Sequence, residues 1–265
     1  MAIRFGPGGL GPVKEAVRNL EEYNKLGLKA CEIEFTYGVY IKPSQAPVIR
    51  ERAKELDIKL SIHAHYWINL NSEEKEKVEQ SKKRIIECCK IGDLLSYGNE
   101  VSIVFHPGFY GKKDKEESYE NIKKEVLELQ EEIERNKWKV KLCPETTGKV
   151  NVFGSVEEIL KLVHDTNCGF TIDFAHLLAR SNGKLSYKEA YKDFKDLKVK
   201  ELHCHFSSIA YGEKGEKNHI LTSEKEIEKL LEVLKGSGKE ITIINESPDP
   251  VGDSVKSLKI WNKLN

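Results

Sequence analysis

The stretch Lys139-Val140-Lys141-Leu142-Cys143-Pro144-Glu145-Thr146-Thr147-Gly148 decides how the rest of the chain is interpreted. It reads as a short strand that carries the carboxylate of Glu145 at its C-terminal tip. Pro144 cannot donate a hydrogen bond to a neighbouring strand, so regular pairing should stop there, and Gly148 then allows the chain to turn. Taken alone, Glu145 is better explained as a solvated loop residue. Its meaning therefore depends on what the other strands carry.

Strand-like and helix-like segments alternate along the whole sequence with short connections. Strands are expected at residues 3–5, 30–36, 59–63, 101–106, around 142, at 169–173, 199–205 and 241–246. Helices are expected near residues 13–25, 44–56, 73–95, 122–133, 155–163, 187–194, 223–235 and 255–261, several with apolar stripes and Ser/Glu caps. Eight alternations without a linker predict a single (β/α)8 TIM barrel domain spanning residues 1–265. The rival, a doubly wound open sheet, is disfavoured because no GxGxxG follows the first strand.

Composition places the chain among water-soluble globular proteins. It has 265 residues, 39% of them hydrophobic and 32% charged, and no apolar run long enough for a membrane helix. The N-terminus lacks the apolar segment of a signal peptide, and the six cysteines show no CxxC spacing, so we expect a cytoplasmic protein with free thiols. We also expect a monomer. A net charge of zero is unusual for a DNA-binding protein, although bound divalent cations can supply the positive field.

Metal-capable side chains recur where the expected strands end. They are His63, His106, Glu145, Asp173, His176, His203, His219 and Glu246. In a barrel, the C-terminal ends of all eight strands meet at one mouth, where active sites are built. A single histidine there is usually an ordinary polar rim residue, but so many on one rim predict a metal centre. Imidazole and carboxylate ligands without thiolate favour Zn, with Mn or Fe as alternatives.

Further histidines leave the exact ligand set open. His63 and His65 are two residues apart, as are His203 and His205, so each pair shares one face of its strand. One member of each pair is then a ligand candidate, and the other supports it or belongs to the loop. His164 falls inside an expected helix and is interpreted as an ordinary helix-end residue.

The order of these motifs resembles that of the endonuclease IV family of apurinic/apyrimidinic-site endonucleases. The motifs are His63-Ala64-His65-Tyr66-Trp67-Ile68-Asn69-Leu70, Phe105-His106-Pro107-Gly108, Pro144-Glu145-Thr146-Thr147, Ile172-Asp173-Phe174-Ala175-His176, Leu202-His203 and Asn245-Glu246-Ser247-Pro248. The resemblance implies a (β/α)8 barrel with a trinuclear zinc site, and for this chain we expect two or three ions. Glu145 would bridge two of them. His63 and His106 would complete one site, Asp173, His203 and Glu246 the second, and His176 with loop residues the third.

The resemblance also implies an activity. It is the metal-dependent hydrolysis of DNA 5′ to abasic sites, as in base excision repair, with catalytic roles for Glu145 and Glu246 and with damaged DNA as the partner. Tyr66 and Trp67 lie beside His63, where aromatic side chains could stack on an opened base step. Packing of both rings against the barrel rim is an equally weighted interpretation.

Departures from the family pattern keep other functions open. The loop after the seventh strand lacks the family's Asp-x-His pair, so His219 is the expected third-site ligand, with Glu216, His65 or His205 as substitutes. One alternative is a sugar isomerase or epimerase of the xylose-isomerase-like barrels, which hold one metal with Glu, Asp, His and Glu. Another is a DNA-damage-binding protein without turnover.

Overall fold

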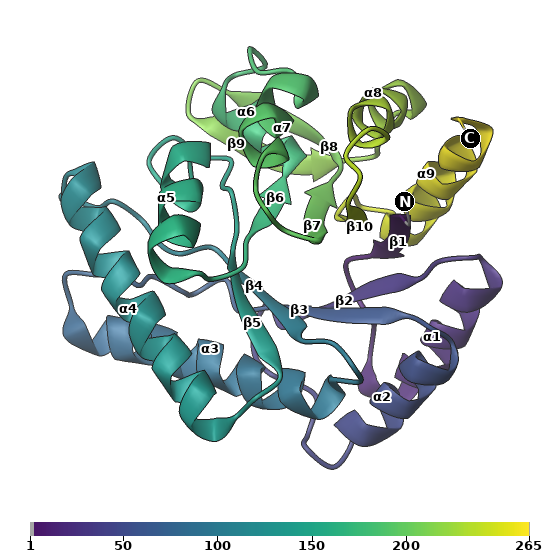
Figure 1. Cartoon of the computed structure of the whole chain (residues 1–265), viewed down its shortest axis with the longest axis horizontal. Coiled ribbons are helices and arrows are strands. Elements are labelled where there is room, and N and C mark those ends of the chain that lie inside the picture. Colours follow the sequence, from purple (N-terminus) through teal and green to yellow (C-terminus); the bar gives the residue numbers. More distant parts are fainter. Residues whose placement is uncertain (1–2, 265) are drawn as a thin grey trace.

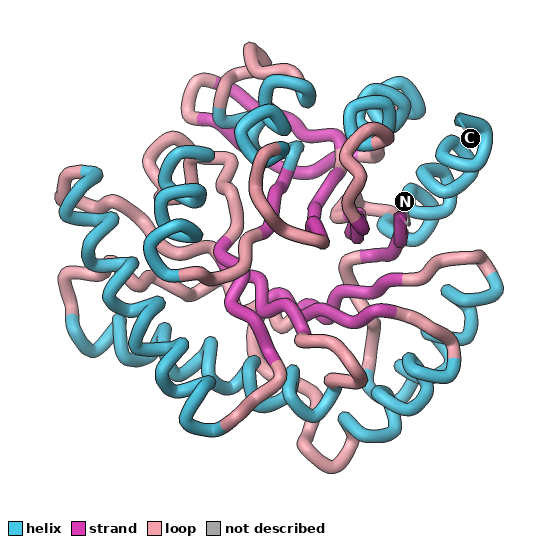
Figure 2. The backbone as a smooth tube through the Cα atoms, viewed as in Figure 1, coloured by secondary structure: helices cyan, strands magenta, loops and turns pink. Residues whose placement is uncertain are grey.

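Eight parallel strands form a closed barrel at the centre of the molecule. The computed structural model describes residues 3–264, and Figures 1 and 2 show the strands enclosed by helices. The barrel strands are β1 (Ile3–Pro7), β2 (Ala30–Glu34), β3 (Lys59–His63), β4 (Val101–Phe105), β5 (Val140–Pro144), β6 (Thr171–Asp173), β7 (Glu201–Phe206) and β10 (Glu240–Asn245). The expected (β/α)8 barrel is confirmed.

The barrel consists of two four-stranded sheets that close on each other. One sheet has the order β1-β10-β7-β6 and the other β2-β3-β4-β5. Parallel bridges between Gly8 and Glu32 and between Glu145 and Thr171 join the two sheets at both seams. All C-terminal strand ends therefore point to the same mouth.

The helices cover the outside of the barrel, and their caps follow the expected sequence signals. They are η1 (Val13–Glu15), α1 (Ala16–Lys25), α2 (Ala46–Glu55), α3 (Lys75–Leu95), α4 (Lys115–Asn136), α5 (Val156–Thr166), α6 (Phe174–Arg180), α7 (Tyr187–Lys195), α8 (Glu224–Leu234) and α9 (Pro250–Leu264). Ser155 and Glu158 form the expected capping box of α5. At α8, Ser223 accepts a hydrogen bond from the backbone of Glu226, whose own side chain contacts Tyr187 instead. No helix within residues 3–264 is both long enough and apolar enough to span a membrane.

Three elements are present that the sequence pattern did not indicate, one helix and the two strands of a hairpin. Helix α6 begins directly at the end of β6, because the Asp173 side chain accepts a hydrogen bond from the backbone of His176. The segment after β7, expected as a loop, forms an antiparallel hairpin of β8 (Ser208–Gly212) and β9 (Gly215–Ile220). The backbone N–H of Glu216 donates to the carbonyl of Gly148, which ties this hairpin to the loop that follows Glu145. Gly215 has φ +91°, and a Cβ there would lie 2.1 Å from the same carbonyl oxygen.

Candidate metal centre

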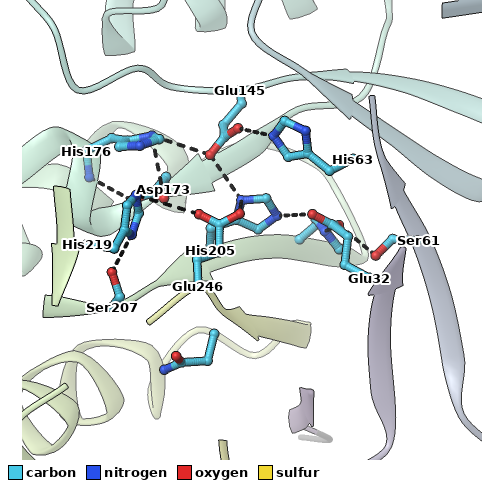
Figure 3. A network of polar contacts seen from close by, with 12 residues as sticks. Glu32, Ser61, His63, Glu145, Asp173, His176, His205, Ser207, His219 and Glu246 are labelled. Carbon is cyan, nitrogen blue, oxygen red and sulfur yellow. Dashed lines mark hydrogen bonds and ion pairs between the residues drawn. The ribbon is translucent and has the colours of Figure 1, made fainter. Parts of the chain in front are cut away.

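Most of the predicted ligands lie at the mouth of the barrel, whereas His203 lies deeper in it. His63 and Asp173 end their strands, His106, Glu145 and Glu246 directly follow theirs, His203 and His205 lie in β7, His176 lies in α6 and His219 lies in β9. Figure 3 shows most of these side chains converging on Glu145. The cavity above them has a volume of about 270 Å³. No lysine or arginine is among its described lining residues, so a phosphate group bound there would need cations for charge neutralisation.

Glu145 is fully buried and contacts histidines through both carboxylate oxygens. Its Oε2 lies 2.9 Å from His106 Nε2 and 3.2 Å from His63 Nε2. Its Oε1 lies 3.0 Å from His205 Nδ1 and 3.4 Å from His176 Nδ1. One carboxylate therefore stands between two pairs of imidazoles, which is the arrangement required of a ligand that bridges two cations.

Two of these histidines each have a ring nitrogen held by a backbone carbonyl group. His63 Nδ1 donates to the Ala64 carbonyl at 2.8 Å, which leaves Nε2 facing Glu145. His176 Nδ1, the nitrogen that also faces Glu145, donates to the Thr146 carbonyl at 3.0 Å, and its Nε2 faces Glu216 Oε2 at 3.6 Å. Such contacts fix the ring orientation and the tautomer of a metal ligand.

Strand pairing decides which β7 histidine reaches the cluster. His203 and His205 are two residues apart and both point into the barrel. The pairing of β6 with β7 places His205 opposite Asp173 and His203 opposite Thr171, one pleat deeper. The structure therefore brings His205, rather than His203, next to Asp173.

His205 completes a group of four potential ligands. It lies with Glu145, Asp173 and Glu246, each offering a ligand atom within 4.8 Å of the others. His205 Nδ1 is 3.1 Å from Glu246 Oε1. The resemblance implied that His203 binds a metal together with Asp173 and Glu246. Among the described residues, His205 is the β7 histidine that lies in this group.

A third group involves the β8–β9 hairpin. Asp173, His176 and His219 have potential ligand atoms within 4.8 Å of one another. His219 Nε2 lies 4.0 Å from Glu246 Oε2, while its Nδ1 contacts the Ser207 hydroxyl. The hairpin, not a loop, therefore places His219 at the cluster.

Glu32 and Glu34 of β2 were missed as site residues. Glu32 is fully buried, and its Oε2 accepts hydrogen bonds from Ser61 at 2.7 Å and from His203 Nε2 at 2.8 Å. Glu34 lines the cavity. A usable signal existed, because two carboxylates at alternate positions in the apolar strand Ala-Cys-Glu-Ile-Glu-Phe must share one face.

Protonation in the cluster reflects competition between burial and neighbouring charges. Burial raises the pKa of a carboxyl group, but His205 and His106 outweigh it and hold the pKa of Glu145 well below its ordinary value. The charge of His205 likewise outweighs burial at Glu246 and lowers its pKa to about 2. At Glu34 burial prevails and raises the pKa to about 8. Divalent cations would replace the protons that the histidines carry in this network.

The donor set fits divalent cations. Besides the groups described above, His63, His106 and Glu145 form a further set of potential ligands within 4.8 Å. Buried side-chain atoms without a hydrogen-bond partner also gather here, among them Asp173 Oδ2 and Glu34 Oε1. Unsatisfied buried oxygens of this kind are the atoms that a bound ion would satisfy.

Other predicted residues lie outside the cluster. His65 Nδ1 faces Cys88 Sγ at 3.8 Å, on the side of helix α3. His164 lies in the last turn of α5, is exposed and pairs with Asp165, away from the cluster. Tyr66 and Trp67 are 62% and 61% exposed, so neither side chain is buried against the barrel rim.

The sequence profile of the xylose isomerase-like TIM barrel family matches residues 20–264, and the chain therefore belongs to this family. It is 37% identical to an uncharacterised protein of Methanocaldococcus jannaschii, over 98% of this chain and 97% of that protein. It is 27% identical to an apurinic-apyrimidinic endonuclease of Caenorhabditis elegans, over 76% of this chain. The match covers only 53% of the length of the C. elegans protein.

Solved structures show the same fold at low sequence identity. The crystal structure of SacUVDE matches with a TM-score of 0.77 and 20% identity, over 100% of this chain and 99% of that chain. A D-tagatose 3-epimerase-like protein matches with a TM-score of 0.73 and 20% identity, over 100% and 98% of the two chains. At such identities the similarity shows the barrel fold alone.

Proposed function

We propose that this protein is a zinc-dependent endonuclease that cleaves DNA 5′ to abasic sites. The observation that supports it best is the position of Glu145, which contacts two pairs of histidines through its two oxygens. A carboxylate with ligands on both sides can hold two cations close together, and paired cations can stabilise the attacking and leaving oxygens in phosphodiester hydrolysis. The relationship to an apurinic-apyrimidinic endonuclease supports the choice of DNA as substrate.

The side chains present could hold two or three ions. His63 and His106, together with Glu145, would hold the first ion. Asp173, His205 and Glu246 would hold the second. His176 and His219 would hold the third, and Glu216 lies close to His176. When bound, zinc-class ions supply positive charge for the phosphoryl oxygens and acidify a coordinated water to a pKa of about 7.

The protein's own groups would then orient the reactants. Glu145 holds the two halves of the site together. The Glu246 carboxylate, which lines the cavity and stays ionised, can accept a hydrogen bond from a water molecule there. Tyr66 also lines the cavity, and its ring centroid lies 6.3 Å from that of Tyr37 in an edge-to-face arrangement. Exposed aromatic rings therefore lie where an opened base step would meet the mouth of the barrel.

The direct test is a nicking assay on a duplex with one abasic site. Protein reconstituted with Zn²⁺ should cleave on the 5′ side of the lesion, and treatment with chelator should abolish cleavage. Absence of nicking after reconstitution with Zn²⁺, Mn²⁺ and Fe²⁺ in turn would contradict the proposal. Selective binding of the abasic duplex without nicking would indicate a damage-binding protein instead.

A sugar isomerase or epimerase is the second candidate. The group of Glu145, Asp173, His205 and Glu246 favours it, because one carboxylate-rich site with a single imidazole would suffice for that chemistry. The candidate leaves His63, His106 and His176 around Glu145 unexplained, and we therefore rank it second. Conversion of a ketohexose by the Mn²⁺-loaded protein, without affinity for DNA, would support it.

A further inference from the structure

His205 connects the mouth of the barrel with a deeper polar group. Its Nδ1 faces Glu145 and Glu246, at 3.0 and 3.1 Å. Its Nε2 faces the opposite way, 2.8 Å from Glu32 Oε1, as the row of dashed contacts in Figure 3 shows. This last contact is an ion pair without hydrogen-bond geometry, and neither of its two atoms has a hydrogen-bond partner among the described residues. One imidazole ring therefore stands between two sets of carboxylates.

The deeper group is arranged to hold Glu32 in place. Ser61 and His203 both donate hydrogen bonds to Glu32 Oε2, which leaves Oε1 for His205. Glu32, His203 and His205 are each at most 5% exposed. Strand pairing fixes this geometry, because β2 and β3 place Glu32 directly beside Ser61. Glu32 is thus surrounded by proton donors.

We infer that Glu32 is a positioning residue that keeps a proton on His205 Nε2 and so presents Nδ1 to a cation at the mouth. The inference rests on the proposed metal centre. Metal-ligating histidines commonly donate their second N–H to a carboxylate, which orients the ring and makes it a stronger ligand. Ser61 and His203 in turn hold the Glu32 carboxylate in place through their hydrogen bonds. This accounts for two buried groups, Glu32 and His203, to which the proposed assignment of ligands gives no ion, although both belong to sets of potential ligands.

The test compares zinc binding by the wild type, Glu32→Gln and the control Glu125→Gln. Glu125 is also a buried carboxylate, but it lies on α4 and pairs with Lys82. In Glu32→Gln, zinc affinity measured by competition with a chelator should fall by about 10- to 100-fold, with the same number of ions at saturation. Glu125→Gln should bind zinc like the wild type.

A spectroscopic measurement separates positioning from a general loss of structure. In ¹⁵N-histidine NMR spectra of the zinc-loaded wild type, His205 should carry its proton on Nε2; its signals are assigned by their loss in His205→Asn. In Glu32→Gln these signals should shift or broaden while the others persist. If Glu32→Gln fails to fold, Ser61→Ala, which keeps Glu32 but removes one of its donors, should show a smaller loss of zinc affinity.

Several results would overturn the inference. One is a proton on His205 Nδ1 in the zinc-loaded wild type. Another is equal zinc affinity of Glu32→Gln and Glu125→Gln. A third is the loss of one whole ion in Glu32→Gln, which would show that Glu32 is itself a ligand. A wild type that binds no zinc would overturn it as well. No DNA is present in these measurements, so a protein that behaves as inferred but does not nick an abasic duplex would contradict the proposed function alone.

Discussion

The hydroxyl oxygen of Ser207 lies 2.6 Å from Nδ1 of His219. Because this contact engages one ring nitrogen, the other, Nε2, is the one that can reach the metal cluster. The contact ties the ring, which comes from the β8–β9 hairpin, to the residue that directly follows β7. In the third group of ligands, the Ser207 hydroxyl fixes the ring of His219 as the backbone carbonyl groups fix the rings of His63 and His176.

We expect Ser207→Ala to weaken the binding of one zinc ion by about 10-fold or more, because the ring of His219 loses its fixed orientation. The adjacent substitution Ser208→Ala is the matched control, since the Ser208 hydroxyl contacts the backbone of Ser223 and no histidine. Titration with Zn²⁺ against a chelating dye gives both affinities. Equal affinities in the two variants would show that Ser207 plays no part in holding His219.

The metal content of the wild type is itself a prediction. We expect two or three zinc-class ions per chain, because the potential ligands fall into several overlapping groups around Glu145. Elemental analysis of protein purified without chelator gives the number. A content near zero after attempted reconstitution would remove the basis of the proposed chemistry.

Glu145→Gln should lose nicking activity by several orders of magnitude while the fold persists. The amide has nearly the same shape, but it lacks the negative charge needed to bridge two cations, so several contributions to catalysis fail together. Nicking of an abasic duplex measures the loss, and circular dichroism checks the fold. Near wild-type turnover in this variant would show that Glu145 has no role in catalysis.

Replacing both Tyr66 and Trp67 with Ala should weaken binding of abasic DNA by about 1–3 kcal/mol for each lost stacking contact. Metal content should not change, because neither side chain is a ligand. Val48→Ala combined with Leu127→Ala, which removes two exposed apolar side chains from outer helices, is the control. Fluorescence anisotropy at several salt concentrations measures affinity, which should fall steeply with salt. A wild type that does not prefer the abasic duplex would count against DNA repair.

The stability of the metal-free protein should decrease as the pH rises from about 6.5 to about 10. Burial disfavours the charged form of His63, but its hydrogen bond to Glu145 and the charges of Glu34, Glu145 and Glu32 outweigh this and raise its pKa to about 10. Since this pKa exceeds the value near 6.5 of an unfolded histidine, the stabilisation is complete below that pH and is lost toward pH 10.

Urea unfolding of chelator-treated protein across this pH range checks the expectation. His63→Gln should flatten the dependence on pH, whereas His164→Gln, at an exposed histidine outside the cluster, should leave it as in the wild type. A wild-type free energy of unfolding that does not change over this interval would contradict the charge state assigned to His63.

The barrel could be predicted from the sequence because each strand and helix carries a local signal. Apolar runs, Ser/Glu caps and short connections identified the alternation, and polar residues at strand ends identified the mouth. Helix α6 escaped notice because Asp173 serves both as the last residue of a strand and as the cap of a helix. The hairpin escaped because Glu216 to His219 is polar and lacks the alternation of a half-buried strand.

The choice between His203 and His205 could not be made from the sequence. Both residues lie on the inward face of β7, and which of them stands level with Glu145 depends on the stagger between β6 and β7. Stagger is a property of two paired strands, so it is absent from the pattern of either strand alone. Glu32 was missed for a different reason, since its partners, Ser61 and His203, come from strands far apart in sequence.

The attachment of the β8–β9 hairpin to the loop after Glu145 limits how this site can diverge among relatives. Gly215 has no room for a side chain against Gly148, and the Glu216 N–H donates to the Gly148 carbonyl. A change that moved the hairpin would therefore also disturb the loop that follows Glu145. New substrate preferences are more accessible through substitutions at the exposed tip, where Glu213 and Lys214 face solvent without touching the cluster.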